Sequence, residues 1–253
     1  MRVDVLHKRL VHDIAMLQPV VDPVFPVGLP VQYQNRSMNL RGFIDRLNTV
    51  TNAFNIHNEI EWDKTVDPGQ VSLSGLWISE SELPENESDA DIRVIWHVHP
   101  GTKRLKHTTT DWNRRRYFWW QIAMHEVIHR HQEVHRTLKG LEPREFLPQT
   151  TSRLLKESQG YYGHYDEIEA HSHNAALEFL TWWNLPYKAC VEAALTYHGR
   201  VLVPTYVCYM ATYMDTPRHP AYLTFKRKVK AWFDVMQKNP EVYRTLQLSR
   251  LVS

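Results

Sequence analysis

The chain of 253 residues has few of the residues that cross-link or anchor a protein. It contains only two cysteines, Cys190 and Cys208, which lie in apolar stretches without Cys-x-x-Cys spacing. This scarcity argues against a disulfide framework and indicates two buried thiols in a reducing compartment. No run approaches the ~18 consecutive apolar residues of a membrane-spanning helix, so we expect no membrane partner. Residues 1–17 are interrupted by charges and lack the apolar core of a secretory signal, so we expect a cytoplasmic location.

The net charge is also low, at +2. The chain is therefore not a protein whose whole surface attracts polyanions. The charge is segregated, however. Residues 57–91 carry ten acidic side chains and one basic, whereas residues 92–116 carry seven basic and one acidic. Solvated loops are one interpretation. The alternative is a basic strip over residues 93–116 that meets an acidic partner or a nucleic-acid backbone.

The hydrophobic pattern predicts an α+β fold. Apolar residues recur at helical spacing over 3–17 and 39–54, and they alternate as in a half-buried strand over 92–98. Long helices are predicted over 111–139 and 166–183, followed by several shorter ones. We therefore expect a small antiparallel or mixed sheet packed on the first long helix, with a large helical C-terminal half.

Histidine is abundant, with fifteen residues, and two of them form the pattern His125-Glu126-Val127-Ile128-His129. Side chains four residues apart on a helix are separated by about 40° around its axis, so His125 and His129 project from one face and can share a metal ion. Glu126 sits close enough to hold a water bound to that ion. Zinc lowers the pKa of bound water to about 7, and a neighbouring carboxylate can take its proton. The motif thus predicts a Zn²⁺ site with Glu126 as the general base of a hydrolase.

A catalytic zinc takes three protein ligands and keeps a fourth position open. The next predicted helix begins with Tyr165-Asp166-Glu167-Ile168-Glu169-Ala170-His171. Together the two stretches resemble zincin metallopeptidases whose third ligand is a glutamate on the following helix, in a Glu-x-x-small-Asp or Glu-x-x-Ala-Asn pattern. They are similar as well to metallopeptidases encoded by tailed bacteriophages. The resemblance covers these two helices and the segment between them.

The resemblance implies a zinc-dependent peptidase that hydrolyses a protein or peptide substrate and has Glu167 as its third zinc ligand. His171 stands where the family has an Asp or Asn that hydrogen-bonds a ligand. Because of that departure, Glu169 and His171 remain alternative third ligands. A phage-encoded member would act in the host cytoplasm or in the virion.

We predict that the chain forms one zincin-like domain over residues 1–253, although the resemblance itself is confined to the two helices. Its N-terminal α/β part would span 1–110, with residues 92–98 as the strand at the edge of the substrate cleft. The metal-binding helices would span 111–183 and a helical C-terminal part 184–253.

Residues 141–165 are rich in Pro, Gly and Tyr, and we expect them to form a loop before the third-ligand helix. Zincins use a Tyr or His to stabilise the oxyanion of the reaction. Candidates for this role, or for supporting a metal ligand, are Tyr161, Tyr162, His164, Tyr165 and His171.

Two alternatives to a peptidase stay open. The chain could be a nucleic-acid-associated protein with a structural zinc, for which the basic strip 93–116 would be the contact surface. It could also be a virion or assembly component that keeps a zincin scaffold, since a fold alone does not fix function. A closed four-ligand site would favour these alternatives, whereas an open site beside a groove would favour the peptidase.

Overall fold

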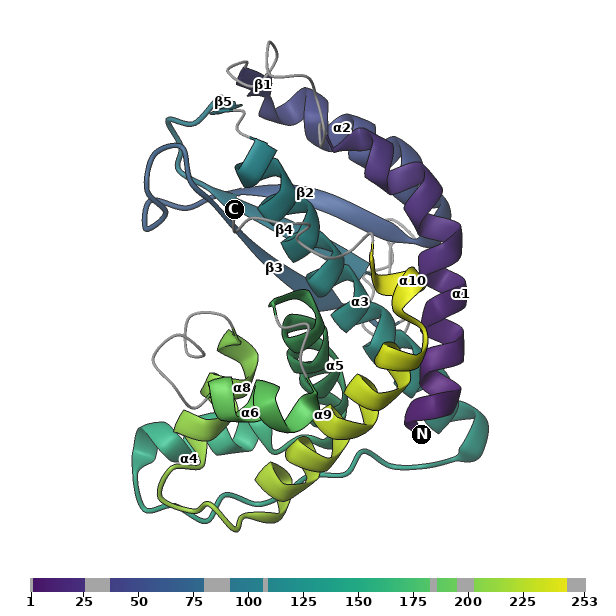
Figure 1. Cartoon of the computed structure of the whole chain (residues 1–253). Coiled ribbons are helices and arrows are strands. Elements are labelled where there is room, and N and C mark those ends of the chain that lie inside the picture. The colour runs from purple at the N-terminus through teal and green to yellow at the C-terminus, as the bar shows by residue number, and fades with distance from the viewer. Residues whose placement is uncertain are drawn as a thin grey trace. The chain divides into compact units, whose positions relative to one another are not determined.

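The computed structural model describes most of the chain, namely residues 2–25, 37–79, 92–106, 109–182, 186–194 and 203–244. These residues fall into two compact units, a sheet unit within Leu10–Val127 and a helical unit within Met1–Arg9 and Ile128–Ser249. Helices α1 (Val3–Val21) and α3 (Thr109–Lys139) each contribute to both units (Figure 1). The architecture is α+β and mostly helical, as predicted.

The sheet unit is built on a three-stranded mixed sheet in the order β2-β4-β3. Strand β2 (Ile56–Trp62) runs parallel to β4 (Ile92–Val98), and β3 (Val71–Trp77) runs antiparallel to it (Figure 1). The prediction that residues 92–98 form an edge strand is wrong, because β4 pairs on both sides and is the central strand. Its four alternating apolar residues are completely buried, which fits a central position: Ile92, Val94, Trp96 and Val98.

A buried amide anchors α3 to this sheet. Trp119 of α3 donates from Nε1 to Asn58 Oδ1 on β2 at 2.7 Å, and Trp96 of β4 approaches the same oxygen at 3.4 Å. Asn58 is 1% exposed. A buried amide oxygen is costly unless donors satisfy it, and here two indoles do so. The contact therefore fixes the N-terminal half of α3 against β2 and β4.

The remaining elements of the sheet unit are short. The single-turn helix η1 (Asp22–Val24) follows α1, and α2 (Leu40–Thr51) continues into η3 (Asn52–Phe54). A separate two-stranded antiparallel ladder joins β1 (Ser37–Asn39) and β5 (Arg104–Lys106).

The helical unit is organised around α5 (Tyr165–Trp182), which packs along α9 (Pro220–Lys238) (Figure 1). The long helices predicted over 111–139 and 166–183 agree with α3 and α5 to within two residues at each end. The other helices of this unit are α4 (Arg153–Tyr162), α6 (Tyr187–Ala194), α8 (Pro204–Thr212) and α10 (Pro240–Arg244).

Helix α4 corrects the prediction of a loop over 141–165. Its N-terminus is capped by Ser152, whose side chain accepts from the backbone N–H of Leu155 at 3.5 Å. Such a cap satisfies one of the N–H groups that a helix start leaves without an intrahelical partner. Tyr161 and Tyr162 consequently lie in the last turn of a helix.

The two cysteines differ in exposure. Cys190 is buried as predicted, but Cys208 is exposed. Helix α8 buries the face that carries Tyr206, Tyr209 and Thr212, which leaves Cys208 on another side. Among the described residues, no helix combines the length and apolar character that a membrane crossing requires.

Candidate metal centre

Helix α3 carries the predicted motif on a shielded face. His125 is 8% exposed and Glu126 7% exposed, and the side chain of His129 is 13% exposed. The neighbouring Val127 and Ile128 are completely buried. The helix is unbroken here, so His125 and His129 lie one turn apart on the same face.

The carboxylate of Glu167, in the first turn of α5, lies between two imidazoles. Its Oε1 is 3.5 Å from His129 Nε2, and its Oε2 is 3.3 Å from His171 Nε2. The three side chains are between 13% and 18% exposed. Within the helical unit, α3 and α5 thus bring together the second motif histidine, the predicted third ligand and His171.

A second, overlapping group contains His125 in place of His129. One ligand atom each of His125, Glu167 and His171 lies within 4.8 Å of the others, so this group could hold a metal ion. Imidazole nitrogen and carboxylate oxygen are donors that Zn²⁺ accepts, although other divalent transition metals also bind them. The donor chemistry therefore fits the predicted cofactor without fixing the metal.

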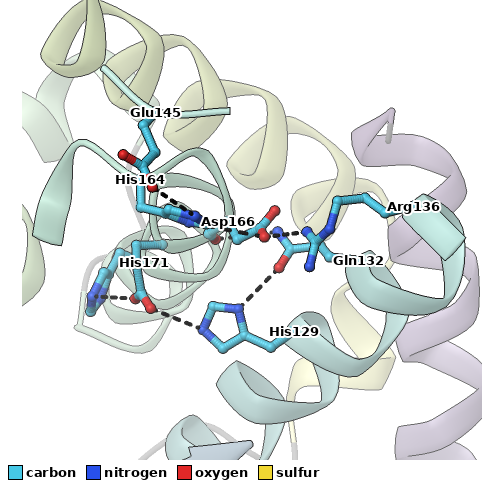
Figure 2. Close-up of polar contacts among 8 residues, drawn as sticks. His129, Gln132, Arg136, Glu145, His164, Asp166 and His171 are labelled. Carbon is cyan, nitrogen blue, oxygen red and sulfur yellow. Dashed lines mark hydrogen bonds and ion pairs between the residues drawn. The ribbon is translucent and has the colours of Figure 1, made fainter. Parts of the chain in front are cut away.

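The orientation of His129 is set by Gln132, one turn further along α3. Gln132 Nε2 donates to the backbone carbonyl of Asp166 at 3.2 Å, so its Oε1 is the end that lies 3.0 Å from His129 Nδ1 (Figure 2). Since an amide oxygen only accepts, Nδ1 of His129 carries the proton. In the neutral ring Nε2 then carries the lone pair, which is the arrangement that metal-binding histidines need.

That tautomer places two acceptors, His129 Nε2 and Glu167 Oε1, 3.5 Å apart. Two lone pairs at this separation repel each other. Either protonation of the ring or a cation between the two atoms removes the repulsion. The geometry of this pair is thus suited to a bound cation.

A second set of charges holds α3 to α5 beside the candidate metal ligands. The Arg136 guanidinium contacts the Asp166 carboxylate, and His164 Nδ1 lies 3.9 Å from the same carboxylate (Figure 2). His164 Nε2 is 4.0 Å from Glu145 Oε1. Asp166 also sits in the first turn of α5, where the helix dipole favours a negative charge. His164 is therefore placed where it supports the start of α5.

Aromatic rings surround His171. The ring centroids of Tyr161, Tyr162 and Tyr209 lie 5.9, 5.3 and 5.8 Å from that of His171. Burial raises the pKa of Tyr209 well above its usual range, with Glu167 adding to the effect, so its phenol stays neutral. Tyr161 is 52% exposed. Of the predicted oxyanion candidates, Tyr161 is thus the solvent-facing phenol beside His171.

Tyr165 and Glu169 face another part of the unit. The ring of Tyr165 lies 5.3 Å from the ammonium of Lys228. Glu169 is 1% exposed, contacts Lys228 Nζ with one oxygen and accepts from Trp232 Nε1 at 3.1 Å with the other. Both carboxylate oxygens of Glu169 are thus engaged by α9.

Glu126 lies against the sheet. A Cβ built on Gly75 of β3 would come 2.5 Å from Glu126 Oε1, 2.8 Å from Glu126 Cγ and 2.7 Å from Ile122 Cγ2. Only a residue without a side chain fits there. Sequence reasoning missed Gly75, Gln132 and Tyr209. Of these, Gln132 has a usable signal, since it follows His129 at helical i,i+3 spacing.

The predicted basic strip is partly neutralised. Arg93 lies 3.3 Å from Glu59, and Arg116 lies 3.2 Å from Asp22. Arg115, by contrast, stacks over the ring of Trp112 at 4.9 Å and keeps its charge. Paired arginines offer less to a phosphate backbone than free ones, so the strip is a weaker contact surface than its composition suggests.

Comparisons of the chain with protein-family models, with curated proteins and with solved structures found no match. The chemistry proposed for the site therefore rests on its own residues. Those residues supply imidazole and carboxylate donors for a metal. They also include the shielded carboxylate of Glu126 on the same helix, and Gln132, which orients the imidazole of His129.

Proposed function

We propose that the chain is a zinc-dependent metallopeptidase. The observation that carries this proposal is the position of Glu167, whose two oxygens lie 3.5 Å from His129 Nε2 and 3.3 Å from His171 Nε2. The glutamate that the resemblance assigned as third ligand thus meets a histidine of the motif. Two histidines and one glutamate form a ligand set that catalytic zinc peptidases use.

Each residue has a defined role in this proposal. His125, His129 and Glu167 hold the metal, and Gln132 orients His129 through its Nδ1 proton. A bound zinc would acidify a water molecule and polarise the scissile carbonyl. Glu126 would accept a proton from the attacking water and donate it to the leaving amine. Tyr161 is the candidate donor to the oxyanion, because it is the exposed phenol beside His171.

Elemental analysis of untagged protein tests the metal site directly. We expect about one zinc per chain in the wild type and in Glu126→Gln, and loss of that zinc in His129→Ala. Absence of zinc from folded wild-type protein, even after zinc is added, would refute the site and the function together.

Hydrolysis of a mixed fluorogenic peptide pool then tests the function. Glu126→Gln keeps the shape of the side chain but cannot accept a proton, so hydrolysis should fall by about 100-fold or more with zinc content unchanged. Equal hydrolysis by the wild type and Glu126→Gln would exclude Glu126 as the general base.

A structural zinc is the second candidate. The contact of His171 Nε2 with Glu167 at 3.3 Å places a fourth donor beside the predicted three. Four protein ligands would close the coordination and leave no position for water. Under this alternative the wild type binds zinc, hydrolyses no peptide of the pool and loses its fold when a chelator removes the metal.

A further inference from the structure

A basic cleft opens on the helical unit, at a place that the proposed peptidase chemistry does not use. Its larger part is a hollow of about 580 Å³ between the start of α1, the segment before α5, and α9. An adjoining hollow of about 510 Å³ shares Arg144, Phe146, Thr224 and Arg227 with it and adds Lys226. Hollows of this size accommodate small organic ligands or single units of a polymer.

The positive charge in the basic cleft exceeds the negative charge. Arg2 is paired with Asp4 at 3.0 Å, and Lys228 is paired with Glu169. The other three cations are Arg144, Lys226 and Arg227, and none of them forms an ion pair with any residue that the structure describes. Three uncompensated cations in one cleft attract an anion carrying more than one charge.

These three cations are held in place by neutral partners. Arg144 lies over the Phe146 ring at 4.9 Å, and Lys226 lies over the Tyr222 ring at 4.5 Å. Arg227 donates from its guanidinium to Thr224 Oγ1 at 3.1 Å. Cation–π contacts position a cation without neutralising it, so its charge remains available to a ligand. The two guanidinium groups also offer the planar fork of donors that matches a phosphate.

Aromatic surface lies beside the charges, because Phe146 and Tyr165 both line the larger hollow. Basic side chains interleaved with aromatic rings are the chemistry by which proteins hold single-stranded nucleic acid, with phosphates on the cations and bases on the rings. An acidic peptide would engage the charges without stacking on the rings. We propose that the basic cleft binds phosphate-bearing nucleotide units, either in single-stranded nucleic acid or as free nucleotide.

Fluorescence anisotropy of a labelled oligothymidylate tests this proposal, with an unlabelled nucleoside triphosphate as competitor. We expect binding that weakens as salt rises, and an affinity at least about tenfold lower in the double variant Arg144→Ala/Arg227→Ala. Both side chains are exposed, so the double variant should fold, and circular dichroism checks this. Arg153→Ala is the matched control: its side chain is 92% exposed and lies outside the cleft, and its affinity should stay within about twofold of the wild type.

The competitor distinguishes the two sources of the phosphate. Displacement by the triphosphate assigns the cleft to free nucleotide, and displacement only by unlabelled oligonucleotide assigns it to nucleic acid; both results support the proposal. Failure of the labelled oligothymidylate to bind, equal binding by the double variant, or equal displacement by polyglutamate would overturn it. Glu126→Gln should bind the probe as the wild type does, which keeps this test independent of peptide hydrolysis.

Discussion

The side chain of Glu126 lies against the backbone of Gly75, so closely that a Cβ at residue 75 would come 2.5 Å from its carboxylate oxygen. Gly75→Ala should therefore displace the proposed general base while leaving the histidines of α3 in place. Because small displacements of a catalytic group are costly, we expect peptide hydrolysis to fall by about 100-fold with zinc content unchanged. Ser72→Ala, at an exposed position of the same strand, is the control and should retain activity. Full activity in Gly75→Ala would contradict this placement of Glu126.

Gln132 should determine how tightly the metal is held. Gln132→Leu removes the acceptor for His129 Nδ1 and leaves the Asp166 carbonyl without its amide donor. Loss of such an orienting partner weakens metal affinity by about 10- to 100-fold. Competition for zinc with a chromophoric chelator measures the change.

Two further variants separate orientation from mere packing at Gln132. Gln132→Glu retains an acceptor for His129, so its zinc affinity should stay closer to that of the wild type than that of Gln132→Leu. Thr137→Ala, at an exposed position further along α3, should leave the affinity unchanged. Equal affinities in Gln132→Leu and the wild type would exclude an orienting role.

The sequence predicts the long helices well because their apolar periodicity is local information. Strand β2 was not predicted because its buried face carries the polar residue Asn58. Its partners come from other segments: the indoles of two tryptophans donate to its amide oxygen, and two side chains of α2 accept from its amide nitrogen. The central position of β4 also could not be predicted, since strand order depends on pairing between distant segments. Nothing in the alternation of 92–98 distinguishes a central strand from an edge strand.

For the candidate site, the sequence could predict what one helix determines. The i,i+4 spacing of His125 and His129 places them on one face, and the resemblance supplied Glu167. The contacts of Gly75 and Tyr209 depend on β3 and α8, which reach the site only through tertiary packing. The contacts of the Glu169 carboxylate with Lys228 and Trp232 likewise depend on α9, which lies more than fifty residues further along the chain.

Alkaline pH should destabilise the helical unit through its buried tyrosines. Burial raises the pKa of Tyr187 to about 12 from the usual 10.0, so the folded chain keeps this phenol neutral while the unfolded chain ionises it. Its contribution to stability is therefore present below pH 10 and is lost as the pH rises to about 12. Tyr187→Phe cannot ionise, and its free energy of unfolding should fall less steeply between these pH values. Urea unfolding at a series of pH values measures the slope, with the half-exposed Tyr161→Phe as control.

Glu167 and Glu169, two residues apart on α5, should separate metal binding from stability. Glu167→Ala removes a ligand, so we expect zinc to be lost while the helical unit stays folded.

Glu169→Gln leaves the ammonium of Lys228, which is 15% exposed, without its carboxylate. Burial lowers the pKa of Lys228, but the carboxylate of Glu169 together with the side chain of Tyr165 more than offsets this and raises the pKa. Breaking a buried ion pair on one side costs about 3–5 kcal/mol, so Glu169→Gln should lower the free energy of unfolding by that amount and still bind one zinc. Elemental analysis and urea unfolding of both variants measure the two effects, and loss of zinc from a folded Glu169→Gln with retention in Glu167→Ala would reassign the third ligand to Glu169.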